Sequence, residues 1–141
     1  MQKKINGAML KNMIFTASKL LDINRPTIDS LNVFPVPDGD TGTNMSMTMQ
    51  SAVKEIQNCK GTNVSDIAAA ASLGALKGAR GNSGVILSQV LRGFCNTIRN
   101  AHDFIDTKLF TKALFVGAQV AYNAVSKPKE GTMLTVARMV A

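Results

Sequence analysis

Apolar residues recur at helical spacing along almost the whole chain, and this periodicity is the feature that most constrains the fold. Stripes with a spacing of three to four residues run through residues 9–21, 45–56, 67–74, 86–98, 109–125 and from about 131 onward. No stretch that is enriched in β-branched residues alternates apolar and polar residues over five or more positions. The segment closest to such alternation, residues 32–37, contains two prolines that would break a β-ladder. The pattern predicts an all-α protein with an extended loop at 32–37 and antiparallel neighbouring helices.

Helix-breaking and polar residues mark where these helices should end. Such breaks lie at residues 24–26, 59–61, about 100 and 128. Ser65 is in position to cap the third helix. The last stripe has no C-cap and no stop signal, so we expect residues 1–141 to form one domain whose C-terminal helices are missing. Apolar residues such as Met133 and Val136 would then be under-covered, which favours association.

The charge balance suits an anionic partner but argues against a nucleic-acid protein. Sixteen Lys and Arg face nine Asp and Glu, a formal charge of +7. The basic residues are scattered, and with no Trp and a single Tyr the chain lacks base-stacking aromatics. A solvated basic surface explains this charge better than nucleic-acid binding. No nucleic-acid partner is therefore expected.

Cysteine usage and the apolar runs indicate the compartment. Cys59 and Cys95 belong to no CxxC or Cys/His cluster, so neither a disulfide framework nor a zinc site is expected, and a reducing cytoplasm fits. The longest run without charge, residues 113–126, is too short for a membrane span. The lone histidine, His102, is interpreted as a surface-loop residue rather than a catalytic one.

One segment, residues 37–45, concentrates glycine and polar side chains. Asp38 and Asp40 are two positions apart, so in an extended segment their carboxylates point the same way and can converge. Gly39 lets the turn tighten. Two carboxylates on one short turn can span the roughly 3.5–4 Å between paired metals in phosphoryl-transfer sites, and hard oxygen ligands suit Mg²⁺.

The same segment leads directly into a helix, whose first turn offers N–H donors and a positive dipole end to phosphate oxygens. Thr41, Gly42, Thr43 and Asn44 stand at this start. The sequence therefore places metal ligands and phosphate donors within reach of each other. The alternative is an Asx-rich turn that merely caps a helix, with Asp40 or Thr41 as N-cap.

Two further clusters stand at predicted helix starts. Residues 78–84 contain three glycines, which could admit a ligand close to the backbone or form a plain helix–helix turn. Residues 130–134 form the third cluster, in which Met133 is by itself more typical of a core residue.

Taken together and in this order, residues 31–45, 78–89 and 131–134 resemble the signature of a nucleotide-binding domain. That domain is shared by bacterial fatty acid kinases and the L subunit of dihydroxyacetone kinases, and the Phe34-Pro35-Val36-Pro37 form resembles the fatty acid kinase branch. The resemblance implies an antiparallel, up-and-down barrel of eight amphipathic helices, incomplete here. One end of it would hold ATP and two Mg²⁺ ions.

The resemblance also implies roles by position. Asp38 and Asp40 match metal-binding aspartates and would be the catalytic residues, and Asn32 aligns with a third metal-binding aspartate if one residue is inserted. Asn32 is neutral and therefore a weaker ligand. The positions that match nucleotide-contacting residues of the family are Thr43, Asn44, Met45, Gly81, Asn82, Ser83, Thr132 and Met133. Thr41 and Gly42, at the start of the same helix, are also nucleotide-binding candidates.

The function so implied is phosphoryl transfer from ATP to the carboxylate of a fatty acid, which a separate fatty-acid-binding protein carries, giving an acyl phosphate. One alternative is a kinase subunit for dihydroxyacetone or a similar small polyol. Another is a truncated, non-catalytic module that binds nucleotide or a partner. Activity of so short a form, and a homodimeric state, are left open.

Overall fold

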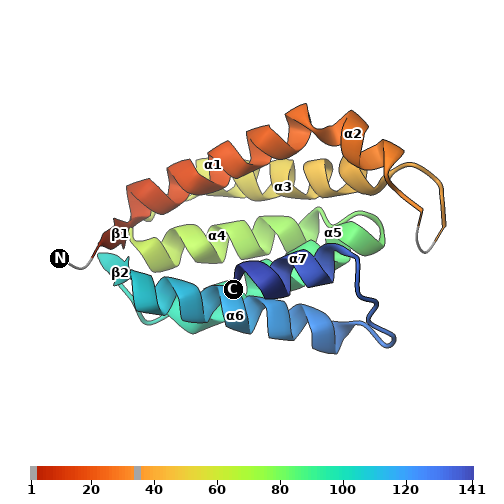
Figure 1. Cartoon of the computed structure of the whole chain (residues 1–141). Coiled ribbons are helices and arrows are strands. Elements are labelled where there is room, and N and C mark those ends of the chain that lie inside the picture. Colours follow the sequence, from red (N-terminus) through yellow and green to blue (C-terminus); the bar gives the residue numbers. More distant parts are fainter. Residues whose placement is uncertain (1–2, 34–35) are drawn as a thin grey trace.

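The computed structural model describes residues 3–33 and 36–141, and helices dominate it (Figure 1). Phe34 and Pro35, which belong to the predicted extended loop, lie outside the described residues. The helices are α1 (Gly7–Ile23), α2 (Arg25–Ser30), α3 (Thr41–Asn58), α4 (Val64–Lys77), α5 (Gly81–Ile98), α6 (Thr107–Ala124) and α7 (Met133–Val140). The all-α prediction is confirmed. None of the helices in the described ranges is long and apolar enough to cross a membrane.

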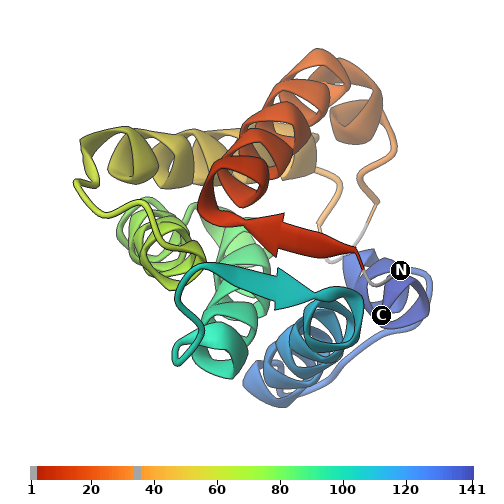
Figure 2. The same ribbon diagram turned by 90° about the vertical axis from the view of Figure 1, so that its left-hand side faces the viewer.

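Successive long helices run in opposite directions and pack side by side, and the end-on view shows them arranged around a shared interior (Figure 2). The core cluster lies towards one end of the bundle, around Ile56, Val64, Ile98 and Ile105, each at most 1% exposed. Small residues permit close approach between helices: a Cβ on Gly93 of α5 would stand 2.7 Å from Cα of Gly117 on α6.

A two-stranded antiparallel sheet closes this well-packed end, and the sequence analysis did not predict it. Strands β1 (Lys4–Asn6) and β2 (Phe104–Asp106) pair with Ile5 opposite Ile105. Both isoleucines are buried. Three residues are too few to show an alternating pattern, so these strands form because tertiary packing brings the segments together.

Helix α2 was also missed. The break predicted at residues 24–26 does end α1, but Pro26 stands at the start of a new six-residue helix, where its missing N–H costs nothing. The proposed cap at Ser65 is wrong by two residues: Asn63 is at the N-cap position and Ser65 lies inside α4.

The predicted stripes are only partly buried. In α1, Leu10 is buried, whereas Met9, Met13 and Leu20 are 46%, 40% and 55% exposed. In α7, Val136 is 62% exposed, in line with the under-covered face expected there, but Met133 is half-buried. Periodicity identified these helices. Which apolar residues of each stripe become buried depends on the helices that pack against it.

Candidate functional site

All three polar clusters lie at the end of the bundle opposite the two-stranded sheet. The loop from α2 to α3, the turn from α4 to α5 and the connection from α6 to α7 all emerge there (Figure 1). Helices α3, α5 and α7 therefore begin at the same end. His102 is exposed in the loop before β2, at the other end, as predicted for a surface-loop histidine.

Asp38 and Asp40 lie close together on the loop before α3. Their mutual influence is visible in the pKa of Asp38, which is raised because its carboxyl group shares a hydrogen bond with that of Asp40, is partly desolvated and feels the charge of Asp40. Gly39 between them adopts φ +67°, a left-handed conformation that glycine tolerates. Within residues 3–33 and 36–141 neither carboxylate forms an ion pair.

The pair is not part of a larger acidic cage. No group of three or more His, Cys, Asp or Glu side chains in the described part of the chain is arranged to hold a metal ion. Two converging, accessible carboxylates nevertheless suit a hard cation that keeps waters and takes further oxygens from a phosphate ligand. The donor set present therefore fits Mg²⁺ bound together with a nucleotide better than Mg²⁺ bound alone.

Asn32 braces this loop from within. Its side-chain amide donates to the carbonyl oxygen of Val36 at 3.1 Å, and its Oδ1 accepts a hydrogen bond from the backbone N–H of Asp40 at 3.2 Å. The oxygen that a metal would use is thus shared with the backbone of the aspartate pair. The role of Asn32 as a metal ligand stays a prediction.

The start of α3 differs from the expectation of open N–H donors. Asp40 is at the N-cap position, as the capping alternative expected, but its side chain makes no cap hydrogen bond. Instead Asp29 of α2 accepts hydrogen bonds from Thr43, from the backbone N–H at 2.9 Å and from Oγ1 at 2.7 Å, and also from the backbone of Gly42. These contacts lower the pKa of Asp29. The N–H groups of Gly42 and Thr43 predicted to meet phosphate are therefore already engaged.

The first two clusters are in direct contact. Ser83 Oγ donates to the carbonyl oxygen of Thr41 at 3.4 Å. Gly81 has φ +64° and lies against the side-chain amide of Asn44, so that an added Cβ would overlap its Nδ2. The backbone N–H of Arg80 donates to Thr48 at 3.2 Å. The starts of α3 and α5 thus form one surface.

The N-terminus of α5 offers the more open anion site. Its N-cap residue, Arg80, makes no side-chain cap hydrogen bond, and the first turn carries no acidic residue. Asn82 is exposed and Ser83 is half-buried. The dipole of α5 therefore meets solvent beside the aspartate loop without a competing carboxylate of its own.

The remaining predicted residues have more local roles. Thr132 caps α7, accepting from the N–H of Leu134 at 3.3 Å, and its hydroxyl donates to the carbonyl oxygen of Lys129 at 2.7 Å. Met133 and Met45 are half-buried. Thr132 and Met133 thus share the site's end of the bundle, at the start of α7 (Figure 1).

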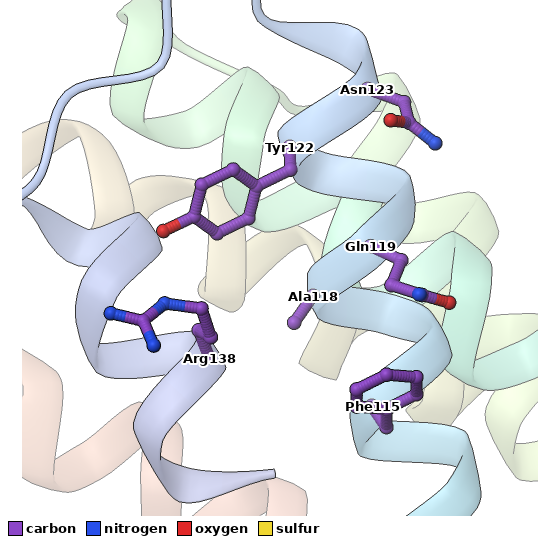
Figure 3. Close-up of a pocket in the computed structure, with 6 residues that line it drawn as sticks. All are labelled: Phe115, Ala118, Gln119, Tyr122, Asn123 and Arg138. Carbon is purple, nitrogen blue, oxygen red and sulfur yellow. The ribbon is translucent and has the colours of Figure 1, made fainter.

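A cavity of about 270 Å³ opens between α6 and α7 (Figure 3). Tyr122 and Arg138 point into it from the two helices, above Ala118 and Phe115. Glu130 joins this corner, because its carboxylate accepts from Tyr122 at 3.0 Å and from Arg138 at 3.1 Å. None of the predicted site residues lines the cavity.

The predicted absence of a disulfide is confirmed, since Cys59 and Cys95 are both free thiols and half-buried. Cys59 Sγ donates to the carbonyl oxygens of Gly61 and Asp66. Burial raises the pKa of the Cys95 thiol. Both cysteines behave as small packed side chains.

In the described part of the chain, a helical bundle carries an aspartate-bearing loop beside the joined starts of α3 and α5. The profile of the DAK2 domain matches residues 35–141, and the chain belongs to that family. It is therefore an ATP-binding module of the dihydroxyacetone kinase L-subunit type.

Relatives in Staphylococcus aureus are much longer. Uncharacterized proteins of strains USA300 and NCTC 8325 are each 49% identical to the chain over 138 residues, which is 98% of this chain. The chain spans about a quarter of their length, 25%.

Proposed function

We propose that this module binds ATP with two Mg²⁺ ions at the joined starts of α3 and α5. It would serve transfer of the γ-phosphoryl group to the carboxylate of a fatty acid held on a separate fatty-acid-binding protein. The observation that carries the proposal is the pair Asp38 and Asp40, brought together on one turn and left without a basic partner in the described residues. Membership of the DAK2 family supports it independently.

Each side chain has a defined task in this scheme. Asp38 and Asp40 would hold the two Mg²⁺ ions, which when bound offset the negative charge of the phosphates. The uncapped start of α5, at Gly81, Asn82 and Ser83, would bind phosphate oxygens. Because Gly81 has no side chain, the start of α5 lies close to Asn44 of α3. This contact would fix the spacing between the two helix starts that flank the nucleotide.

The acceptor needs no general base. A fatty acid carboxylate is already ionised at neutral pH, because ordinary carboxyl pKa values lie near 4. The chain then has to orient the donor and stabilise charge rather than move a proton. The position of His102 at the opposite end of the bundle agrees with this requirement.

Calorimetry with Mg²⁺ and a non-hydrolysable ATP analogue tests the binding step. We expect the unaltered chain to bind the analogue only with Mg²⁺, and Asp38→Ala and Asp40→Ala to abolish that binding. Asp103→Ala is the matched control, because it removes the same charge from an exposed loop at the other end of the bundle. Unchanged binding in either site variant would refute the proposal.

The acceptor is tested separately. ATP consumption is followed with a fatty acid on its binding protein and, in parallel, with dihydroxyacetone and its cognate carrier subunit. Phosphorylation of the fatty acid alone supports the proposal, and phosphorylation of dihydroxyacetone supports the alternative kinase. Nucleotide binding without turnover on either acceptor would identify a non-catalytic module.

A further inference from the structure

Asp29, near the end of α2, lies at the base of the loop that carries Asp38 and Asp40. Both of its carboxylate oxygens bind the residue that follows the loop: Oδ1 accepts from the N–H of Thr43 at 2.9 Å and Oδ2 from Thr43 Oγ1 at 2.7 Å. The backbone of Gly42 adds a third hydrogen bond. This carboxylate is thus fully engaged with the start of α3 and is not directed at the metal site.

The main chain of Asp29 contacts the rest of the loop. Its carbonyl oxygen accepts a hydrogen bond from the N–H of Asn32 at 3.2 Å, at the beginning of the loop. The same oxygen would stand 3.7 Å from a Cβ placed on Gly39, the residue between the two aspartates. Asp29 therefore binds residues at the beginning of the loop and just after its end, and its carbonyl oxygen lies on the side of Gly39 where a Cβ would stand.

Helix α2 sits tightly on α3 at this point. A Cβ on Gly42 would come within 2.6 Å of the carbonyl oxygen of Arg25 and 2.9 Å of Cβ of Ile28. Residue 42 thus has no room for a side chain unless α2 moves away. The negative charge of Asp29 also meets the positive end of the α3 dipole, which holds the two helices together.

We propose that Asp29 is a positioning residue that clamps α2 to the start of α3 and thereby fixes the direction in which Asp38 and Asp40 present their carboxylates. Asn32 braces the loop internally, and Asp29 anchors its two ends. The inference rests on the proposed function, because it assigns the clamp a role in metal and nucleotide binding. Without the clamp the loop samples other conformations, and the two carboxylates no longer converge.

The test compares Asp29→Ala and Asp29→Asn with a matched control. Asp22 is also a carboxylate that holds a neighbouring helix to α3, accepting from Ser46 at 2.8 Å and Gln50 at 3.3 Å, but it does so one turn away from the loop. Asp22→Ala removes a comparable helix–helix contact, together with the exposed ion pair between Asp22 and Arg25 at 3.8 Å, but none of the hydrogen bonds that Asp29 and Asn32 make to the loop and the start of α3. Asparagine at position 29 keeps an acceptor for the N–H of Thr43.

Two readouts are measured: calorimetric binding of Mg²⁺ with the ATP analogue, and hydrogen exchange of residues 36–40 in the metal-free protein. We expect Asp29→Ala to weaken binding about 10-fold or more and to speed exchange in the loop severalfold. Asp29→Asn should have smaller effects on both the binding and the loop exchange. Excess Mg²⁺ should restore binding of the analogue to Asp29→Ala. Asp22→Ala should lower the melting temperature without changing either readout.

The outcomes separate the inference from the proposed function. If the unaltered chain binds the analogue and Asp29→Ala binds it equally well, the positioning role is wrong although the function stands. If the unaltered chain does not bind the analogue, the proposed function is wrong. Hydrogen exchange of the loop then still tests whether Asp29 clamps α2 to the start of α3. Equal loop exchange in Asp29→Ala and Asp22→Ala overturns the inference in either case.

Discussion

Ser83 Oγ donates a hydrogen bond to the carbonyl oxygen of Thr41 at 3.4 Å, across 42 residues of sequence. This contact joins the starts of α5 and α3, two helices that α4 separates in the chain. Each start alone is an ordinary helix N-terminus. The contact brings the uncapped start of α5 beside the loop that carries Asp38 and Asp40, whereas Asp29 already occupies the start of α3.

Metal binding at this pair should be lost in acid, as the pH falls through the raised pKa of Asp38. The pKa of Asp38 is raised above 3.8 by its hydrogen bond with Asp40 and by the charge of that neighbour. Binding needs both groups ionised, so it should be complete at neutral pH and lost as the pH falls through the raised pKa. Calorimetry of Mg²⁺ and the ATP analogue over a pH series measures this loss.

Stability of the metal-free protein should change in the opposite sense. A carboxyl group whose pKa is higher in the folded than in the unfolded chain destabilises the fold above that pKa, and the penalty disappears as the pH falls through it. Asp38→Asn should therefore raise the melting temperature at neutral pH, by a small amount because Asp38 is exposed. A lower melting temperature in this variant would contradict the repulsion between the two carboxylates.

Alanine at Gly81 should be more costly than alanine at Gly131. Both glycines have positive φ, +64° and +80°, and this backbone conformation costs a residue with a side chain about 1–2 kcal/mol. A Cβ at Gly131 would meet nothing within 4 Å, whereas one at Gly81 would overlap the amide of Asn44. In denaturant unfolding, Gly131→Ala should lower the free energy of unfolding by about 1–2 kcal/mol, and Gly81→Ala should lower it further.

The same pair of variants separates binding from stability. Gly81→Ala displaces Asn44 and should weaken binding of the ATP analogue, while Gly131→Ala should leave binding closer to that of the unaltered chain. Equal unfolding free energies for the two variants would show that the contact between Gly81 and Asn44 is unimportant.

Tyr122, the single tyrosine of the chain, should report on the corner between α6 and α7. Hydrogen bonds from Thr135, Arg138 and Tyr122 hold the pKa of Glu130 below its ordinary value of 4.5. The ionised carboxylate therefore stabilises this corner above pH 4.5, and the contribution is lost as the pH falls through the lowered pKa. Tyrosine emission should show a transition below pH 4.5, and Glu130→Gln should remove it. A transition that persists in that variant would assign it to another group.

Much of the site's composition was predictable from local sequence. The spacing of Asp38 and Asp40 indicated that their carboxylates can converge, and Gly39 indicated a tight turn, in which it has φ +67°. The positive φ of Gly81 was not predicted. Asp29 was missed because it belongs to a six-residue helix that leaves no periodic signal and because its partner, Thr43, is 14 positions away. The only local signal was Pro26, which can begin a helix as well as end one.

The sequence by itself determined the longer helices and the pairing of two carboxylates on one loop, because helical periodicity and the directions of neighbouring side chains are local properties of the chain. Only the tertiary structure decided that α5 begins beside α3, that Asp29 rather than a ligand fills the start of α3, and that Ile5 pairs with Ile105. These are contacts between residues far apart in sequence. They form only when burial of the shared core offsets the entropy of bringing the segments together.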